Sequence, residues 1–448
     1  MTSPSVPAIR SGLRSLGGAL LLIALAGPLS AQSAGLYLEG AGARALAIGG
    51  ATTASPASPL SALAFNPAGL LGADGWTVVG SLTGSRVSGD YANRVSARNG
   101  MGQQFGAIGS LGLSYGSGKA AFGFAAQPIN AYLADWEYPD VPGVAEAQYQ
   151  NADQRALFLN YRLGLGAAYR LSDRLLVGVS GGLVYNRNEL DAPYVFQGEP
   201  TLSGLKVDVD LVADTWAPNF NAGLLFQALD AMTVGLSWTS ATSFEADGDL
   251  VGDAGAQFAA LGLSGAPPEL AYSATVEVGL PQMVSLGIAV DASDRLALFG
   301  QLDRVDWGGE FDSLVLDLDD GTNEAVNSLV GDDRLLEESP LEWESRTVSR
   351  LGLTYDFDDV LEGRLGYSHV DSPSPDRTLT PLSGLITEHT LSGGLGWSSG
   401  PWQAALTYQF ELPAERSVGE SGLLSGEYSD TRTQVSIHRV SLTVARPF

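Results

Sequence analysis

The stretch VSIHRVSLTVARPF, residues 435–448, alternates between apolar and polar side chains. Val440, Leu442, Val444 and Phe448 fall on one face of an extended chain, because side chains two residues apart point the same way. Arg446 is the exception on that face. This pattern predicts an amphipathic β-strand, and a strand that crosses a membrane needs such a face toward lipid within a closed sheet.

Two strands in the middle of the chain show the same alternation more strongly. Over 155–169 one face is apolar and ends in aromatic residues, and the other face is small or polar; the first set is Leu157, Leu159, Tyr161, Leu163, Leu165 and Tyr169, and the second is Phe158, Asn160, Arg162, Gly164 and Gly166. Residues 175–186 repeat the pattern. A helix would scatter both sets around its circumference. The pattern is typical of a lipid-exposed barrel with a partly wet lumen, although a soluble β-sandwich also alternates.

Short and long connections alternate along the chain. The short ones are expected at 171–174, 229–231, 292–294, 358–360 and 398–401, and the long ones at 129–154, 191–214, 244–271, 307–344, 371–388 and 411–430. Short turns at one end and long loops at the other are the arrangement of outer-membrane barrels. Counting strands from Trp76, with 272–290 as one strand bent at Pro281, gives about 14. The predicted fold is therefore all-β, a transmembrane antiparallel β-barrel.

The N-terminal residues indicate export. Arg10 and Arg14 precede a short apolar run from Leu16 to Ala26, and a small-residue cleavage site follows at 29–31. This predicts a signal peptide over 1–31, too short for a spanning helix. Together with the barrel, it places the protein in the bacterial outer membrane. The chain has 0 cysteines, which is compatible with export without disulfide bonds.

Charge and composition exclude several functions. The formal charge of −26 is a poor match for nucleic acid, and many of the acidic residues lie in expected loops. Asp317–Gly321 resembles part of a calcium loop but lacks its ligand spacing, so no metal site and no cofactor are expected. The 3 histidines, His369, His389 and His438, are too scattered for a metal centre or a Ser-His-acid triad. We therefore expect no enzyme activity.

Two groups of motifs carry a family resemblance. The first is Gly42-Ala43-Arg44-Ala45, Gly49-Gly50-Ala51 and Phe65-Asn66-Pro67-Ala68-Gly69-Leu70, just ahead of the first strand. The second is Leu280-Pro281-Gln282, a strand pair closing on Asp306-Trp307, then Ser349–Tyr355, Arg364–Ser368 and Asp371–Pro375. In this order they resemble the FadL/TodX family of outer-membrane transporters of long-chain fatty acids and hydrocarbons. The long loops show no match.

The resemblance implies a mechanism. An N-terminal hatch, expected over 32–75, would plug a barrel formed by 76–448. A hydrophobic ligand would be captured by extracellular loops, enter an apolar pocket and leave sideways into the membrane. In the hatch, Arg44 would anchor the plug, and Asn66, Pro67 and Ala68 would form a turn whose movement opens the path.

The residues of the chain indicate where the features implied by the resemblance would lie. Proline removes a ladder donor, so a lateral opening is expected where the third strand, 120–126, meets Gln127 and Pro128, with an ordinary strand end as the alternative. The loop residues expected to form a ligand groove, or otherwise to pack on one another, are Phe196, Leu202, Leu205, Phe258, Leu261 and Leu263. Candidates to bind a carboxylate are Arg155, Arg162, Arg350 and Arg364, each of which has a protein carboxylate as the alternative partner. If no arginine reaches the pocket, a neutral hydrocarbon is the better substrate.

Partners follow from these expectations. They are a hydrophobic small molecule, outer-membrane lipid and, through the last strand ending at Phe448, the barrel-assembly machinery, because a terminal aromatic residue resembles its insertion signal. The alternative function is a general diffusion porin or a structural barrel. A porin has no need of a Gly-Ala-rich plug, so the segment 32–74 discriminates between them.

Overall fold

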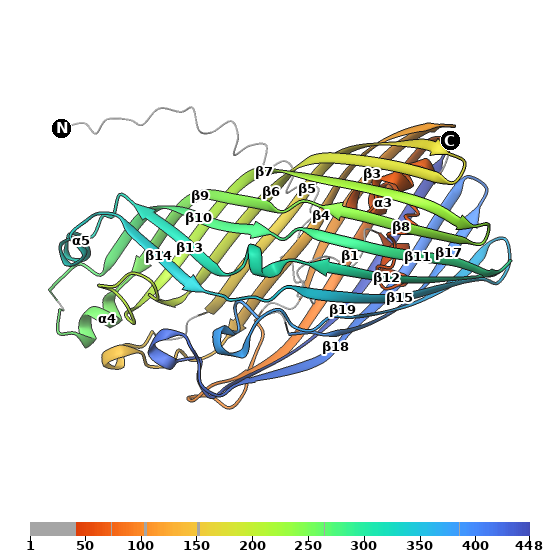
Figure 1. The fold of residues 1–448 in the computed structure, drawn as a ribbon. Helices are drawn as coiled ribbons and strands as arrows, with labels where there is room; N and C mark the ends of the chain where they lie inside the picture. Colours follow the sequence, from red (N-terminus) through yellow and green to blue (C-terminus); the bar gives the residue numbers. More distant parts are fainter. Residues whose placement is uncertain (1–41, 73, 103–104, 150–152, 264, 385) are drawn as a thin grey trace.

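The computed structural model describes residues 42–72, 74–102, 105–149, 153–263, 265–384 and 386–448, so the predicted signal peptide and residues 32–41 lie outside the described residues. Its strands form one antiparallel sheet that closes on itself (Figure 1). Closure is made by β1 (Gly75–Ala92) and β19 (Thr431–Pro447), whose register runs from Thr77 opposite Pro447 to Ala92 opposite Arg432. A closed sheet leaves no free edge in hydrocarbon.

The barrel has 14 strands, as the sequence predicts. Ten of them are continuous, and each of the other four is divided in two by an interruption. The undivided strands are β1, β3 (Phe105–Ser117), β4 (Ala120–Glu137), β5 (Asp153–Ser172), β6 (Leu175–Val195), β7 (Lys206–Leu229), β16 (Leu361–His369), β17 (His389–Ser399), β18 (Trp402–Val418) and β19. The divided ones are β8 (Met232–Thr239) with β9 (Thr242–Asp253), β10 (Glu269–Leu280) with β11 (Met283–Ser293), β12 (Leu296–Val305) with β13 (Ser313–Asp319), and β14 (Leu335–Pro340) with β15 (Arg346–Asp356). The predicted bend at Pro281 is the interruption between β10 and β11.

The strands extend further than the sequence analysis expected. Much of the predicted long loops is strand: β4 continues to Glu137, β6 and β7 pair up to Val195 and Lys206, and 307–344 contains β13, α5 (Glu324–Val330) and β14. These segments lack a lipid-facing apolar stripe because they stand above the membrane, and the stripe was the signal used to find strands. We call the end with these extensions the loop end and the other end the turn end.

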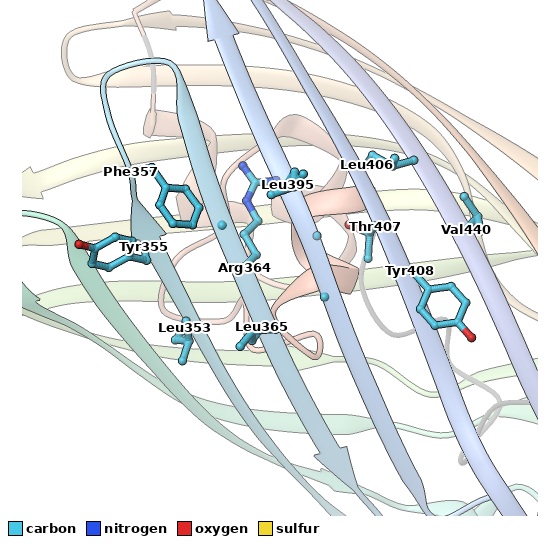
Figure 2. Close-up of a pocket in the computed structure, with 13 residues that line it drawn as sticks. Leu353, Tyr355, Phe357, Arg364, Leu365, Leu395, Leu406, Thr407, Tyr408 and Val440 are labelled. Carbon is cyan, nitrogen blue, oxygen red and sulfur yellow. The ribbon is translucent and has the colours of Figure 1, made fainter.

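The outer face of the barrel is apolar at mid-height. Leu165 is 66% exposed and Leu442 is 50% exposed, as lipid-facing residues should be. Arg446, the predicted exception, lies 4.9 Å over the Trp402 ring and 4.5 Å from the Phe448 ring, so its charge is stacked between aromatic faces. A hollow of about 710 Å³ lies in this outer wall, and Figure 2 shows the residues that line it. It is floored by glycines and rimmed by exposed residues such as Leu395 and Leu406, so it faces lipid.

Residues 42–72 form short helices inside the ring of strands: α2 (Ala43–Ala47), α3 (Pro59–Ala64) and the 3-10 helix η1 (Pro67–Gly72) (Figure 1). Ser58 caps α3 by accepting a hydrogen bond from the Ser61 backbone, and Pro59 occupies its first turn. The segment bonds to strands all round the barrel. Ala43 N donates to Thr443 of β19, Ser392 of β17 donates to Ala47 O, and Thr53 N donates to Gln301 of β12.

The remaining elements are small. They are β2 (Asn99–Gly100), the helix α4 (Gly255–Ala260) and the 3-10 turns η2 (Val144–Glu146), η3 (Trp307–Gly309), η4 (Asp376–Thr378) and η5 (Leu424–Gly426). No helix among the described residues is long and apolar enough to cross a membrane.

Candidate functional site

An apolar cavity of about 220 Å³ lies in the loop-end half of the barrel. Its wall is contributed by β4, β5, β6, β10, β13 and the connections above them. The aromatic residues that line it are Tyr132, Phe158, Tyr194, Phe311, Trp343 and Tyr428, and its polar lining includes Asn188, Glu189, Gln197, Thr378 and Ser383. A partly enclosed apolar space with a few polar groups is the usual form of a small-molecule site.

Stacked aromatic rings build one side of this cavity. Phe311 and Trp343 stack with centroids 4.6 Å apart, and Trp307 meets Phe311 edge-on at 5.3 Å. Phe158 of β5 meets Phe311 edge-on at 6.1 Å from across the lumen. Trp307 follows β12, and Trp343 precedes β15. Both residues therefore lie where a long strand is interrupted, and the interruptions turn their rings inward. Such rings present rigid, flat surfaces at low entropic cost.

A buried lysine ties together the connections that roof the cavity. Lys206 is fully buried, and its Nζ lies 2.8 Å from Asp140 and 2.5 Å from Glu427. It also donates to Val141 O at 2.6 Å. Three connections therefore meet at one cation: the one after β4, the start of β7 and the one after β18. Buried charges persist when they are paired in this way.

Burial shifts the acid–base behaviour of this roof. Burial raises the pKa of Glu427, although the nearby Lys206 ammonium opposes the shift. Burial also raises the pKa of Tyr428 well above its usual value, and the Glu427 carboxylate adds to that effect. A second clamp lies beside it: the buried Glu337 carboxylate accepts hydrogen bonds from the Gln197 and Glu199 backbone amides.

The barrel wall is interrupted between β3 and β4. Their register runs from Ser117 opposite Ala120 to Leu111 opposite Ala126 and ends there. Above this point Phe105–Ser110 pairs only with β1 and Gln127–Glu137 only with β5, until Met101 bridges to Trp136. Gly102 N also donates to Asp135 O at 3.0 Å. We call the stretch between these two closures the window.

The window begins at the predicted residues Gln127 and Pro128. The alternative, an ordinary strand end after 120–126, is wrong: β4 continues through Pro128 to Glu137, with a register shift against β5 between Pro128 and Asn130. Proline provides no N–H for a ladder, so pairing with β3 is lost while pairing with β5 continues past a bulge. Gln127 points into the lumen, where its Nε2 donates to Leu60 O of α3 at 3.2 Å.

Apolar side chains close the window in this structure. Ile108 of β3 packs against outward-facing residues of β4 and β5, and the members of this cluster, which we call the seam, are Ile108, Ala126, Ala131, Leu133, Leu157, Leu159 and Tyr161. Leu159 is 3% exposed, although Leu165 on the same face is 66% exposed. The upper part of β3 therefore covers the outer face of β5.

Buried asparagines connect the cavity with the window. Asn188 donates to Asn186 at 2.7 Å, Asn186 to Asn160 at 3.0 Å, and Asn160 to Asn130 at 2.6 Å. Asn188 lines the cavity, whereas Asn130 lies at the bulge of β4. We call these four residues the asparagine chain. It joins β4 to β5 and β6 by side chains where the backbone ladder is irregular.

None of the four candidate arginines lines the cavity. Three have a carboxylate partner: Arg155 lies 3.1 Å from Glu189, Arg350 2.6 Å from Asp303, and Arg364 2.5 Å from Glu362. Arg162 is buried below the cavity. It donates to Leu63 O of α3 at 2.7 Å and to Ser180 Oγ at 3.1 Å, with no carboxylate within ion-pair distance among the described residues.

The predicted groove residues are divided between two environments. Phe196 and Leu202 are buried in an apolar cluster of the loop end, and Leu205 and Phe258 pack against it. Leu261 is 44% and Leu263 49% exposed, just after α4. None of the six lines the cavity.

The predicted hatch residues contact the barrel wall in different ways. Asn66 Nδ2 donates to Thr53 O at 2.7 Å and to Leu224 O of β7 at 3.0 Å, and its Oδ1 accepts from Ala68 N. Pro67 and Ala68 lie against Gly178 of β6, where any side chain would collide with their backbone. Arg44 donates to Ser55 O at 3.4 Å, and its guanidinium lies 5.8 Å over the Phe299 ring of β12.

Several residues of the site were missed by sequence reasoning. Phe311 and Trp343 lie in a segment assigned to an acidic loop, and Tyr161 was assigned to the lipid face. Tyr161 does face outward, but it is buried, because β3 covers it. The placement of Asn160 and Asn186 on predicted inward faces was the one available signal for the asparagine chain.

Comparison with known proteins agrees with this architecture. A family model described as outer membrane protein transport protein (OMPP1/FadL/TodX) matches residues 24–448, whereas no curated protein sequence matches. Among solved structures, the P. putida toluene transporter TodX shares 17% identity at a TM-score of 0.73, covering 92% of this chain and 99% of that one. The Ralstonia pickettii toluene transporter TbuX shares 17% at 0.69, with coverage of 92% and 99%. A Pseudomonas aeruginosa FadL homologue shares 15% at 0.71, with coverage of 93% and 100%. The family model matches nearly the whole sequence, which shows that the chain belongs to the OMPP1/FadL/TodX family of outer membrane transport proteins.

Proposed function

We propose that the protein passively takes up neutral hydrophobic molecules of about one aromatic ring, which enter at the loop end, bind in the cavity and leave through the window into the membrane. The observation that carries this proposal is the aromatic-lined cavity of about 220 Å³ that no arginine lines. The residues 42–72 below it are proposed to act as a hatch that prevents free flow of water.

The size of the cavity favours a compact ligand. An apolar cavity of about 150 Å³ is enough to bind benzene. A space of about 220 Å³ therefore suits a substituted single ring, and it is too small to enclose a long acyl chain. Stacked rings such as Phe311 and Trp343 offer an aromatic ligand both offset-stacked and edge-to-face contacts.

The charges near the cavity favour a neutral ligand. Glu189 is the carboxylate in its lining, and it is held by Arg155 and by Arg187, 2.6 Å away. A ligand carboxylate here would meet a like charge rather than a free cation. The second candidate function is fatty-acid uptake, in which the ligand carboxylate would have to reach Arg162 below the cavity. The Arg162 guanidinium is a candidate because the partners described for it, Leu63 O and Ser180 Oγ, are neutral.

The route is supported by three features. The exposed Leu261 and Leu263 offer an apolar surface at the loop end. Toward the turn end, the asparagine chain and Arg162, which bonds to Leu63 O of α3, place buried polar groups below the cavity. The seam, by contrast, is an apolar connection between lumen and lipid. Two of the similar structures are toluene transporters by title, which agrees with this substrate class.

The expected affinity is modest. Burying the seven carbons of toluene yields about 5.6 kcal/mol at about 0.8 kcal/mol per carbon, which corresponds to a Kd on the order of 0.1 mM. Weak binding suits a passive carrier, because a ligand that binds tightly leaves slowly.

Calorimetry on the barrel in lipid nanodiscs tests the proposal, with toluene, decane and oleate as ligands. We expect saturable binding of toluene, about five- to tenfold weaker in Phe158→Ala because an aromatic contact is lost. Phe122→Ala is the matched control, since Phe122 is 61% exposed on the outer face.

Other results would change the assignment. Oleate binding that is lost in Arg162→Gln, together with no toluene binding, would establish a fatty-acid carrier instead. Absence of binding by all three ligands, combined with ion conductance that does not rise on deletion of residues 42–72, would favour a porin or structural barrel.

A further inference from the structure

Tyr161 lies at the centre of the window. In the strand registers it is opposite Pro128 of β4 on one side and opposite Tyr185 of β6 on the other. Its ring belongs to the seam and is 5% exposed. Its Oη donates a hydrogen bond to Gly109 O of β3 at 3.0 Å, so the side chain reaches from β5 past β4 to the far side of the window.

The acceptor of this bond is a backbone group at the unpaired edge of β3. Gly109 pairs with Leu82 of β1 on one side, whereas the β3–β4 ladder already ends at Leu111. A backbone carbonyl left without a donor inside a membrane is costly, because no water can replace the missing partner. Pro128, the β4 residue opposite Tyr161, has no N–H to offer. The Tyr161 hydroxyl thus donates to Gly109 O the hydrogen bond that the interrupted ladder does not supply.

We propose that the Tyr161 hydroxyl is the latch of the window: its bond to Gly109 O holds β3 against β5, and it must break each time a molecule passes to the membrane. The latch rests on the proposed function: Tyr161 would be a positioning residue that acts when the ligand leaves for the membrane. A hydrocarbon has no hydrogen-bonding group, so it cannot replace the broken bond. The latch therefore adds to the barrier for exit and leaves affinity for the cavity unchanged, because Tyr161 does not line the cavity.

Tyr161→Phe removes the hydroxyl and keeps the ring in the seam. Tyr185→Phe is the matched control: Tyr185 is its cross-strand neighbour, is 6% exposed on the same face, and packs on Trp216 with ring centroids 5.3 Å apart. Nitrobenzene serves as a neutral aromatic probe that quenches tryptophan, and Trp343 lines the cavity. Stopped-flow quenching in nanodiscs then yields the association and dissociation rate constants and the Kd.

We expect both rate constants to rise about three- to tenfold in Tyr161→Phe, with the Kd within twofold of that of the unmodified protein. Tyr185→Phe should change neither rate. Unchanged rates in Tyr161→Phe with intact saturable binding would overturn the latch and leave the proposed function standing. A Kd shift without a rate increase would show a packing role instead. Absence of saturable quenching in the unmodified protein would refute the proposed function and, with it, the latch.

Discussion

The outer face of β5 has two halves that differ in what covers them. In the lower half Leu165 and Tyr169 are 66% and 49% exposed and face lipid. In the upper half Leu159 and Tyr161 are 3% and 5% exposed under β3. The residue types and the alternation are the same in both halves. The difference arises where the pairing of β3 with β4 ends next to Pro128, so a single interruption in a ladder turns a lipid-facing surface into a buried seam.

The largest expected effect is a difference in unfolding free energy between two Leu→Ala variants, one in each half of the outer face of β5. Leu159→Ala should cost about 2–4 kcal/mol of unfolding free energy, because it leaves a void in the packed seam. Leu165→Ala should cost less than about 1 kcal/mol, since lipid chains fill the space. Urea unfolding in vesicles, followed by tryptophan fluorescence, measures both. Equal losses would show that the upper half of β5 is also covered by lipid.

A smaller effect is expected at the asparagine chain, which holds the upper half of β4 in place. Asn160→Ala removes the bonds to Asn130 and Asn186 and should cost about 1–3 kcal/mol. It should also speed nitrobenzene exchange through the window. The control is Asn219→Ala, which removes a buried amide that bonds to Ser240 and Thr242. We expect a similar loss of unfolding free energy and no change in the rate of nitrobenzene exchange. If the two variants exchanged equally fast, the chain would have no special role at the window.

The smallest expected effect is a pH dependence of the stability of the connections around Glu427, which roof the cavity. Burial raises the pKa of Glu427 in the folded protein, so the folded roof binds this proton more tightly than the unfolded chain does. The resulting stability is present at low pH and is lost as pH rises through the raised pKa. Asp140, Lys206, Tyr138 and Tyr428 surround the group.

Hydrogen exchange, corrected for its intrinsic pH dependence, measures this change. Amides of 138–149 and 419–430 should be more protected near pH 5.5 than near pH 8, by less than about 1 kcal/mol. Residues 42–72, which lie in the lower half of the barrel, should show no such change. Glu427→Gln should abolish the difference; persistence of the pH dependence in that variant would assign it to another group.

The sequence predicted the lower half of the molecule better than the upper half. Lipid imposes an apolar stripe at period two, so the strand count, the bend at Pro281 and the outward faces of β5, β6 and β19 could be read directly. Above the membrane this constraint is absent. For that reason the extensions of β6, β7, β13 and β14 were assigned to loops, and the rings of Phe311 and Trp343 were not identified as cavity residues.

The window illustrates the same limit. Pro128 marked its position, because the missing N–H of proline is a property of the residue itself. That β4 continues beyond Pro128, and that β3 overlaps β5 there, depends on pairing between strands, which single-chain periodicity does not contain. The partners of Arg155 and Arg350 were likewise decided by neighbours on other strands, whereas Glu362 lies on the same strand as Arg364.

The two closures of the window also define its shape. Pairing on this side resumes at Met101 and Gly102, so the part of β4 that lacks a partner on β3 runs from Gln127 to Ala134, roughly 25 Å at about 3.3 Å per residue. The proposed exit would therefore be a long slot, whose width depends on how far β3 and β4 separate and whose length is fixed by the two closures. A flat ring can slip through on its edge, and a slender rod can pass broadside, whereas a branched or globular molecule of the same mass cannot. Cross-section rather than length or mass would then decide which hydrophobic compounds reach the bilayer.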